Sequence, residues 1–171
     1  NIKIINQFAK LGEDKYGTAC SLLAAAEFVG DDEFIFLYGD NLKSPRDIER
    51  LSWLVAGNYV SGYRYPGKGI EKYGQLDLAG NRLKQIVEKP ASPISDVING
   101  GLYRFTPEIF DKAQNVTKSA RGELELVDAV NVLASEERVK VFMLQKYFID
   151  FGSPRDLPGV EKFITEHYGS N

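Results

Sequence analysis

Short apolar runs bounded by turn residues alternate along this chain with longer segments of mixed polarity. Runs of about five bulky residues between turns are typical of buried strands, and apolar residues at helical spacing indicate helices. The pattern predicts strands at 2–7, 34–38, 59–65, 73–78, 82–88, 97–105, 139–144 and 147–149. It predicts helices at 18–28, at 45–55, from 106, around 126–133 and at 154–167.

The order of these elements predicts an α/β fold. No low-complexity stretch or Gly/Ser-rich linker divides the chain, so we expect residues 1–171 to form one domain. The expected architecture is a mixed, mostly parallel sheet flanked by helices, as in Rossmann-like folds. The run at 34–38 is apolar almost throughout and predicts a strand covered on both faces. The run at 147–149 is expected to return to the same sheet.

Two aspartates stand directly after apolar runs, and the same tetrapeptide follows each of them. Asp40 follows the run at 34–38, Asp150 follows the run at 147–149, and Ser-Pro-Arg-Asp occurs at 44–47 and again at 153–156. This tetrapeptide is typical of a helix start, with serine as the cap, proline at the first helical position and aspartate near the positive end of the dipole.

Both aspartates are therefore expected at the carboxyl ends of strands, where open α/β sheets bind ligands. Two carboxylates that meet there would suit a divalent metal ion. The alternative is that Asp40 and Asp150 each cap a turn.

Composition narrows the classes of function. A formal charge of −3 and a pI near 5.3 give no basic footprint, so a nucleic-acid partner is not expected. No apolar stretch approaches the ~20 residues that span a bilayer, and the N-terminus does not resemble a signal peptide, so no membrane partner is expected. The single Cys20 cannot form an internal disulfide and is expected to be a packed small hydrophobe, which fits a cytoplasmic protein. His167 is expected to complement a helix dipole rather than to serve a catalytic triad.

Seven pieces of the sequence, in one order, resemble the sugar-1-phosphate nucleotidyltransferases, especially the glucose-1-phosphate uridylyl- and thymidylyltransferases. The pieces are Gly17-Thr18-Ala19, Gly39-Asp40-Asn41, Tyr73-Gly74, Val87-Glu88-Lys89-Pro90, Asn99-Gly100-Gly101-Leu102-Tyr103, Arg121-Gly122-Glu123-Leu124-Glu125 with Asp128, and Ile149-Asp150-Phe151-Gly152-Ser153-Pro154. Each is weak alone, but the shared order makes the resemblance specific over residues 7 to 157.

The resemblance implies a reaction and its partners. The family transfers a nucleotidyl group from a nucleoside triphosphate, here UTP or dTTP, to a sugar 1-phosphate such as glucose 1-phosphate, and it releases pyrophosphate. Asp40 and Asp150 would bind Mg²⁺, the cofactor. Lys89 would contact the sugar phosphate in a catalytic role, and Glu88 would accept hydrogen bonds from sugar hydroxyls. The alternative for Glu88 and Lys89 is an exposed ion pair worth at most ~1 kcal/mol.

The resemblance also implies a substrate pocket. Gly17 would lie against the base, and Gly74 and Gly101 would line the sugar pocket, although glycine is also the default turn residue. Asn99 could bind sugar hydroxyls or form a turn. Glu123 could touch the sugar or serve as an acid at a helix N-terminus.

The family's N-terminal strand and triphosphate-wrapping loop have no counterpart in this sequence, which starts at Asn1. We therefore expect N-terminal strands to be missing, with the chain as the C-terminal portion of the family's catalytic domain and inactive alone. It would then associate with the missing segment, or form a homo-oligomer. The alternative function is a noncatalytic regulatory domain that binds a sugar phosphate or nucleotide sugar.

Overall fold

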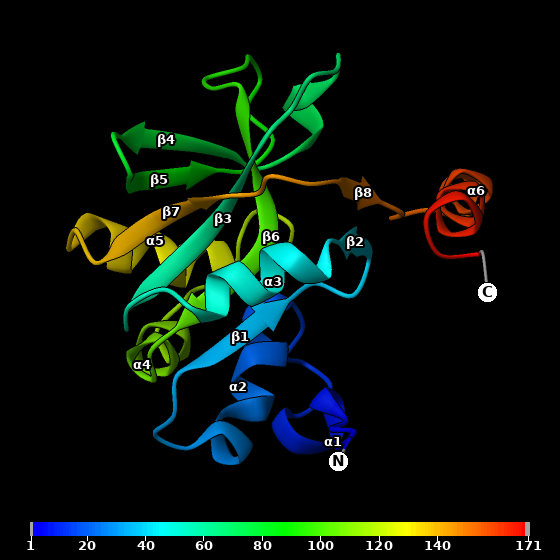
Figure 1. Cartoon of the computed structure of the whole chain (residues 1–171). Coiled ribbons are helices and arrows are strands. Elements are labelled where there is room, and N and C mark those ends of the chain that lie inside the picture. The colour runs from blue at the N-terminus through cyan, green and yellow to red at the C-terminus, as the bar shows by residue number, and fades with distance from the viewer. Residues whose placement is uncertain (1, 170–171) are drawn as a thin grey trace.

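The computed structural model describes residues 2–169 and has a twisted sheet with helices on both faces (Figure 1). The helices are α1 (Gln7–Leu11), α2 (Thr18–Val29), α3 (Pro45–Ser52), α4 (Glu108–Gln114), α5 (Leu126–Ser135) and α6 (Leu157–Tyr168), with 3₁₀ turns η1 (Ile70–Lys72) and η2 (Pro154–Asp156). The strands are β1 (Phe34–Leu37), β2 (Asn41–Lys43), β3 (Asn58–Arg64), β4 (Gln75–Ala79), β5 (Arg82–Val87), β6 (Val97–Phe105), β7 (Val139–Met143) and β8 (Phe148–Asp150). Within the described residues, no helix is both long and apolar enough to cross a membrane.

The main sheet has six strands in the order β1-β6-β3-β7-β5-β4, with a further contact between β6 and β4. The predicted mixed α/β sheet is confirmed. Parallel pairing is less frequent than expected: within residues 2–169 it joins β3 to β7, and the other pairs of the main sheet are antiparallel.

Alternate residues of the central strands pack into two separate cores. On β6, Tyr103 is fully buried against the helices α2, α4 and α5, through residues such as Leu22 and Leu126. Its neighbour Leu102 points to the opposite face, where Leu51 of α3 covers it. Strand residues alternate between faces with a period of two, so one strand supplies both cores.

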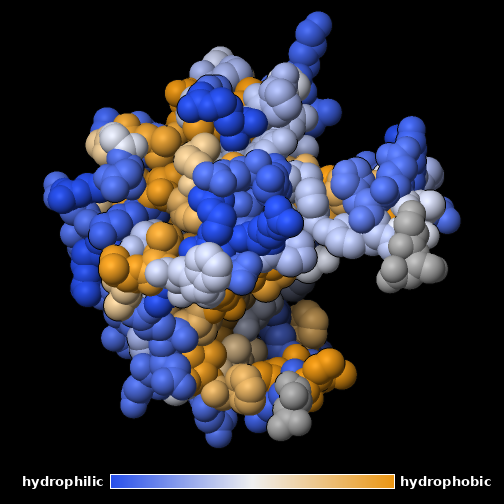
Figure 2. All heavy atoms as spheres, viewed as in Figure 1, coloured by the Kyte–Doolittle hydropathy of each residue, from blue (hydrophilic) through white to orange (hydrophobic). Residues whose placement is uncertain are grey.

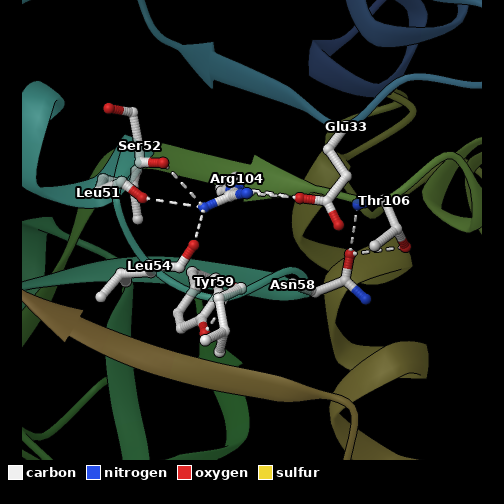
Figure 3. A network of polar contacts seen from close by, with 9 residues as sticks. Glu33, Leu51, Ser52, Leu54, Asn58, Tyr59, Arg104 and Thr106 are labelled. Atoms are coloured by element: carbon white, nitrogen blue, oxygen red, sulfur yellow. Dashed lines mark hydrogen bonds and ion pairs between the residues drawn. The ribbon is translucent and has the colours of Figure 1, made fainter.

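Arg104 on β6 fastens the end of α3 to the sheet (Figure 3). Its guanidinium donates to Glu33 at 2.7 and 3.1 Å and to the backbone carbonyls of Leu51, Ser52 and Leu54. Carbonyls at a helix end lack intrahelical donors, so one arginine satisfies the last turn and the following loop. The helix ends at Ser52, earlier than predicted.

A two-stranded antiparallel sheet stands beside the main sheet and corrects one prediction. The strand at 147–149 was expected to join the main sheet, but β8 instead pairs with β2. Its partner is a three-residue strand after Asp40, too short and polar for its pattern to be recognised. Beyond β8 the chain leaves the body of the molecule, and α6 stands apart from it (Figure 1).

The prediction of a strand at 2–7 is wrong. Residues 2–6 have no regular structure, and Ile2 and Ile4 are 96% and 91% exposed. Asn6 instead caps α1, because its side chain accepts a hydrogen bond from the amide of Ala9. Figure 2 shows hydrophobic surface around this end of the molecule. Apolar alternation alone does not make a strand where no neighbouring strand offers hydrogen bonds.

Strand β1 is also less covered than predicted. It pairs with β6 alone and lies at the edge of the described sheet. Phe34, Ile35 and Phe36 are half-buried and Leu37 is 47% exposed. The apolar sequence of β1 makes burial favourable, but the neighbouring elements determine how much of each side chain is buried.

The hairpin of β4 and β5, predicted from the turn at Gly80-Asn81, is confirmed and is fixed by a helix side chain. Asn131 of α5 accepts from the amide of Ile86 at 2.7 Å and donates to its carbonyl at 2.9 Å. The amide side chain therefore replaces a strand partner for Ile86.

We expect Asn131→Ala to lower the free energy of unfolding by about 1–3 kcal/mol, because it leaves two backbone groups of Ile86 without a partner. Chemical denaturation measures this. Asn115→Ala is the matched control, since Asn115 is exposed and bonds its own helix end. Equal stability of the two variants would contradict this role of Asn131.

Candidate active site

A cleft of about 660 Å³ opens where β1, the β4–β5 hairpin, β6 and the β2–β8 pair meet. Seven of the nine predicted site residues line it: Asp40, Gly74, Glu88, Lys89, Asn99, Gly101 and Asp150. Gly17 and Glu123 are outside its lining, although Thr18 and Arg121 beside them are part of it. Residues from distant parts of the chain therefore meet in one cavity.

The pairing of β2 with β8 places Asp40 beside Asp150. Asn41 lies opposite Asp150 in the register, and the amide of Phe151 donates to the carbonyl of Asp40 at 2.9 Å. Partial burial and then the negative charge of Asp40 raise the pKa of Asp150 above its usual value. The two carboxylates are thus close enough to repel each other.

The oxygen atoms around this pair of aspartates are the kind of ligand that a hard divalent cation takes. Asn41 donates to Asp40 Oδ1 at 3.1 Å, which leaves its own Oδ1 buried without a hydrogen-bond partner among the described residues. Within residues 2–169 no set of three or more His, Cys, Asp or Glu side chains is arranged to hold a metal. Two carboxylates with substrate oxygens and waters are the set that Mg²⁺ usually takes.

Lys43 adds a buried positive charge to this end of the cleft. The residue is only 8% exposed, and its Nζ has no hydrogen-bond partner among the described residues. Burial lowers the pKa of Lys43 to about 8, against the opposing attraction of Asp40 and Asp150. The ammonium also lies 5.8 Å from the centre of the Phe148 ring. Sequence analysis missed Lys43 because it lies outside the recognised Gly39-Asp40-Asn41 motif and its surroundings come from β8.

Glu88 and Lys89 occupy the other end of the cleft. Burial raises the pKa of Glu88, as do the charges of Glu125 and Asp128, and the charges of Arg121 and Lys89 oppose this. A Cβ atom at Gly74 would lie 2.7 Å from Glu88 Oε1, so glycine leaves room for this carboxylate. Lys89 has a φ of 41°, which is unusual for a residue with a side chain and is often found at functional sites.

Arg121 is a cation that the sequence analysis did not single out, although it lies in the quoted Arg-Gly-Glu-Leu-Glu piece. It donates to Glu125 Oε1 at 2.7 Å and lies 4.0 Å from Glu123. With Lys89 it contributes two positive charges near Glu88, among the carboxylates of Glu125 and Asp128.

Asn99 and Gly101 form part of the cleft wall. Asn99 donates to the hydroxyl of Tyr103 at 2.7 Å and accepts from the amide of Gly101 at 3.1 Å. The ring of Tyr38 would lie 2.8 Å from a Cβ at Gly101, whose φ is 62°. Both the nitrogen and the oxygen of the Asn99 side chain therefore bond neighbouring groups of the cleft wall. Sugar binding by Asn99 stays a prediction.

Gly17 has a packing reason to be glycine. It precedes α2 with a φ of 126°, and a Cβ there would lie 2.3 Å from the carbonyl oxygen of Leu124. Thr18 then accepts from the amide of Leu126 at 2.8 Å. This contact holds the segment with Arg121 and Glu125 against α2, and contact of Gly17 with a base stays a prediction.

Comparison with known proteins agrees with this arrangement. The family described as nucleotidyl transferase matches residues 1–167. The chain belongs to this family. The resemblance inferred from the seven sequence pieces is thereby confirmed.

Relatives of this nucleotidyl transferase chain are longer proteins. It is 35% identical over 157 residues to a bifunctional sugar-1-phosphate nucleotidylyltransferase/acetyltransferase of Sulfurisphaera tokodaii, covering 91% of this chain and 38% of that protein. It is 31% identical to a glucose-1-phosphate thymidylyltransferase of Streptomyces griseus, covering 88% of this chain and 43% of the relative. The chain therefore spans less than half the length of these curated relatives.

Solved structures share the fold of this nucleotidyl transferase chain. UDP-glucose pyrophosphorylase from Acinetobacter baumannii superposes with a TM-score of 0.73 at 25% identity, covering 89% of this chain and 57% of that one. A putative glucose-1-phosphate thymidylyltransferase from Bacillus anthracis gives a TM-score of 0.77 at 21% identity, covering 97% and 71%. The second similarity concerns the fold alone.

Two variants at Lys89 test the strained backbone of the cleft. We expect Lys89→Gly to be more stable than Lys89→Ala by about 1 kcal/mol, because the left-handed conformation is costly for a residue with a Cβ. Both variants lose the charge, so the difference in their free energies of unfolding isolates the backbone. An alanine variant as stable as the glycine variant would contradict a left-handed Lys89.

Proposed function

We propose that the intact protein transfers a nucleotidyl group from UTP or dTTP to a sugar 1-phosphate, with glucose 1-phosphate as the preferred acceptor, and releases pyrophosphate. The observation that carries this proposal is the presence of two charged groups in the lining of one cleft. The Asp40–Asp150 carboxylate pair forms one charged group of the lining, and Glu88, Lys89 and Arg121 form the other, which also lines a second cavity that the two aspartates do not reach. Membership of the nucleotidyl transferase family supports the reaction class.

The reaction brings an oxygen of the sugar phosphate to the α-phosphorus of the nucleotide. Such transfers require in-line positioning and neutralisation of negative charge more than covalent help from the protein. In this proposal Lys89 and Arg121, which line the cleft, hold the sugar phosphate, and Glu88 accepts hydrogen bonds from sugar hydroxyls. When bound by Asp40 and Asp150, Mg²⁺ would neutralise charge on the reacting phosphates.

The choice of substrates rests on the relatives. The protein from Streptomyces griseus is named as a glucose-1-phosphate thymidylyltransferase, and the one from Acinetobacter baumannii as a UDP-glucose pyrophosphorylase. Both names indicate a pyrimidine nucleotide and a glucosyl group. These substrates are proposed for this protein on the same basis.

In the intact protein, Asp40→Asn and Asp150→Asn should each lower turnover by orders of magnitude while leaving the fold intact, because each removes a charge that holds the cation. Pyrophosphate release measures turnover, and circular dichroism checks the fold. Asp32→Asn, the same change at an exposed turn, is the control and should be normal. Near-normal turnover in both cleft variants would refute the proposed metal site.

Lys89→Gly should weaken glucose 1-phosphate binding by about 10- to 100-fold, since a charge-assisted hydrogen bond contributes about 1.5–3 kcal/mol. Binding of the nucleoside triphosphate should change little. Isothermal titration of each ligand measures both affinities. The control is Lys84→Ala, which removes an exposed lysine of β5. The reverse pattern, with only nucleotide binding weakened, would place Lys89 on the nucleotide.

A further inference from the structure

Asp47 is a fully buried carboxylate in the first turn of α3, and two of its partners come from a segment about 100 residues further along the chain. Its oxygens accept hydrogen bonds from the amide of Gln145 at 3.2 Å and from the amide of Lys146 at 3.0 Å. Arg50 donates to it at 2.7 Å. Ser44, at the N-cap, makes no side-chain cap bond. Asp47 therefore does more than complement a helix dipole.

Arg50 anchors this group to the main sheet. Its guanidinium lies 4.7 Å from the centre of the Phe142 ring on β7. A buried carboxylate is costly unless it is paired and hydrogen-bonded, and Asp47 has both kinds of partner. These contacts fix the start of α3 to the segment that leaves β7.

The place of this connection matters for the cleft. Helix α3 begins just after β2, and residues 145–146 lead into β8. Asp47 thus fastens the two strands at the end where Lys43 lies opposite Phe148. Asp40 and Asp150 lie at the other end of the same pair, and Figure 1 shows β2 and β8 beside α3.

We propose that Asp47 is a positioning residue that sets the separation of Asp40 and Asp150 and thereby the affinity of their cation site. This inference rests on the metal site of the proposed function. Strands of three residues are marginal on their own, so the β2–β8 pair needs an external fastening to keep its geometry. The hydrogen bonds of Asp47 to residues 145–146 hold the two strands together at the end away from Asp40 and Asp150.

The test is a titration of the intact protein with Mn²⁺ alone, followed by electron paramagnetic resonance. Asp47→Asn should raise the Kd for Mn²⁺ by about tenfold or more, because an amide cannot accept from both backbone groups and pair with Arg50. The Kd for glucose 1-phosphate should stay within about twofold, and saturating Mn²⁺ should restore most of the turnover.

Asn58→Ala is the matched control. Asn58 is also buried and hydrogen-bonded, to Thr106 (Figure 3) and to Glu108, but it lies at the start of β3, away from residues 145–146, which follow the end of β7 that pairs with Gly62. It should lose stability without losing Mn²⁺ affinity. If Asp47→Asn does not fold, Arg50→Gln provides the milder test, because Arg50 is partly exposed and both backbone bonds to Asp47 remain. It should weaken Mn²⁺ binding several-fold.

The outcomes separate the two claims. Wild-type Mn²⁺ affinity in a folded Asp47→Asn, or in Arg50→Gln where that variant replaces it, would overturn the positioning role and leave the proposed function intact. Mn²⁺ binding that is insensitive to Asp40→Asn would instead overturn the metal site, and the inference with it. Weaker Mn²⁺ binding in the Asp47 or Arg50 variant but not in Asn58→Ala supports the inference.

Discussion

The candidate site depends on one contact between distant segments, the pairing of β2 with β8. Asn41 and Asp150 lie opposite each other in this pair although more than half of the chain separates them. Without it, Asp40 would follow an edge strand and Asp150 a loop, and neither could share a ligand with the other. Because the pair is short, it relies on surrounding contacts for its geometry, and the bonds of Asp47 to the β7–β8 connection are among these.

Several charged side chains in the cleft have surroundings that are unfavourable for the stability of the fold. The raised pKa of Asp150 shows that its environment disfavours the ionised form, and the buried ammonium of Lys43 balances this only in part. Around Glu88, desolvation and the carboxylates of Glu125 and Asp128 raise its pKa against two nearby cations, and Lys89 holds an unfavourable backbone conformation. Strained and repelling groups of this kind gather at functional sites, where a bound ligand relieves them. Stability and binding therefore make opposite demands on the same residues.

Much of the fold could be predicted because its signals are local. Turn chemistry marked the β4–β5 hairpin, the apolar run at 97–105 matched β6, and the residues flanking Asp40 and Asp150 indicated a shared site. The failures are non-local. Whether the run at 2–7 or at 147–149 joins the sheet depends on which strand edge is free, and sequence periodicity does not carry that information. Lys43 and Asp47 were missed as site residues for the same reason, since their importance comes from partners far along the chain.

The central claim is that the β2–β8 pair makes one cation site from two carboxylates. Anomalous diffraction from crystals of the intact protein grown with Mn²⁺ tests it most directly. The account predicts a single peak in the cleft, coordinated by oxygens of both Asp40 and Asp150, with remaining positions filled by water or substrate oxygens. A peak on one carboxylate alone, or a cleft in which Mn²⁺ binds away from both, would contradict it.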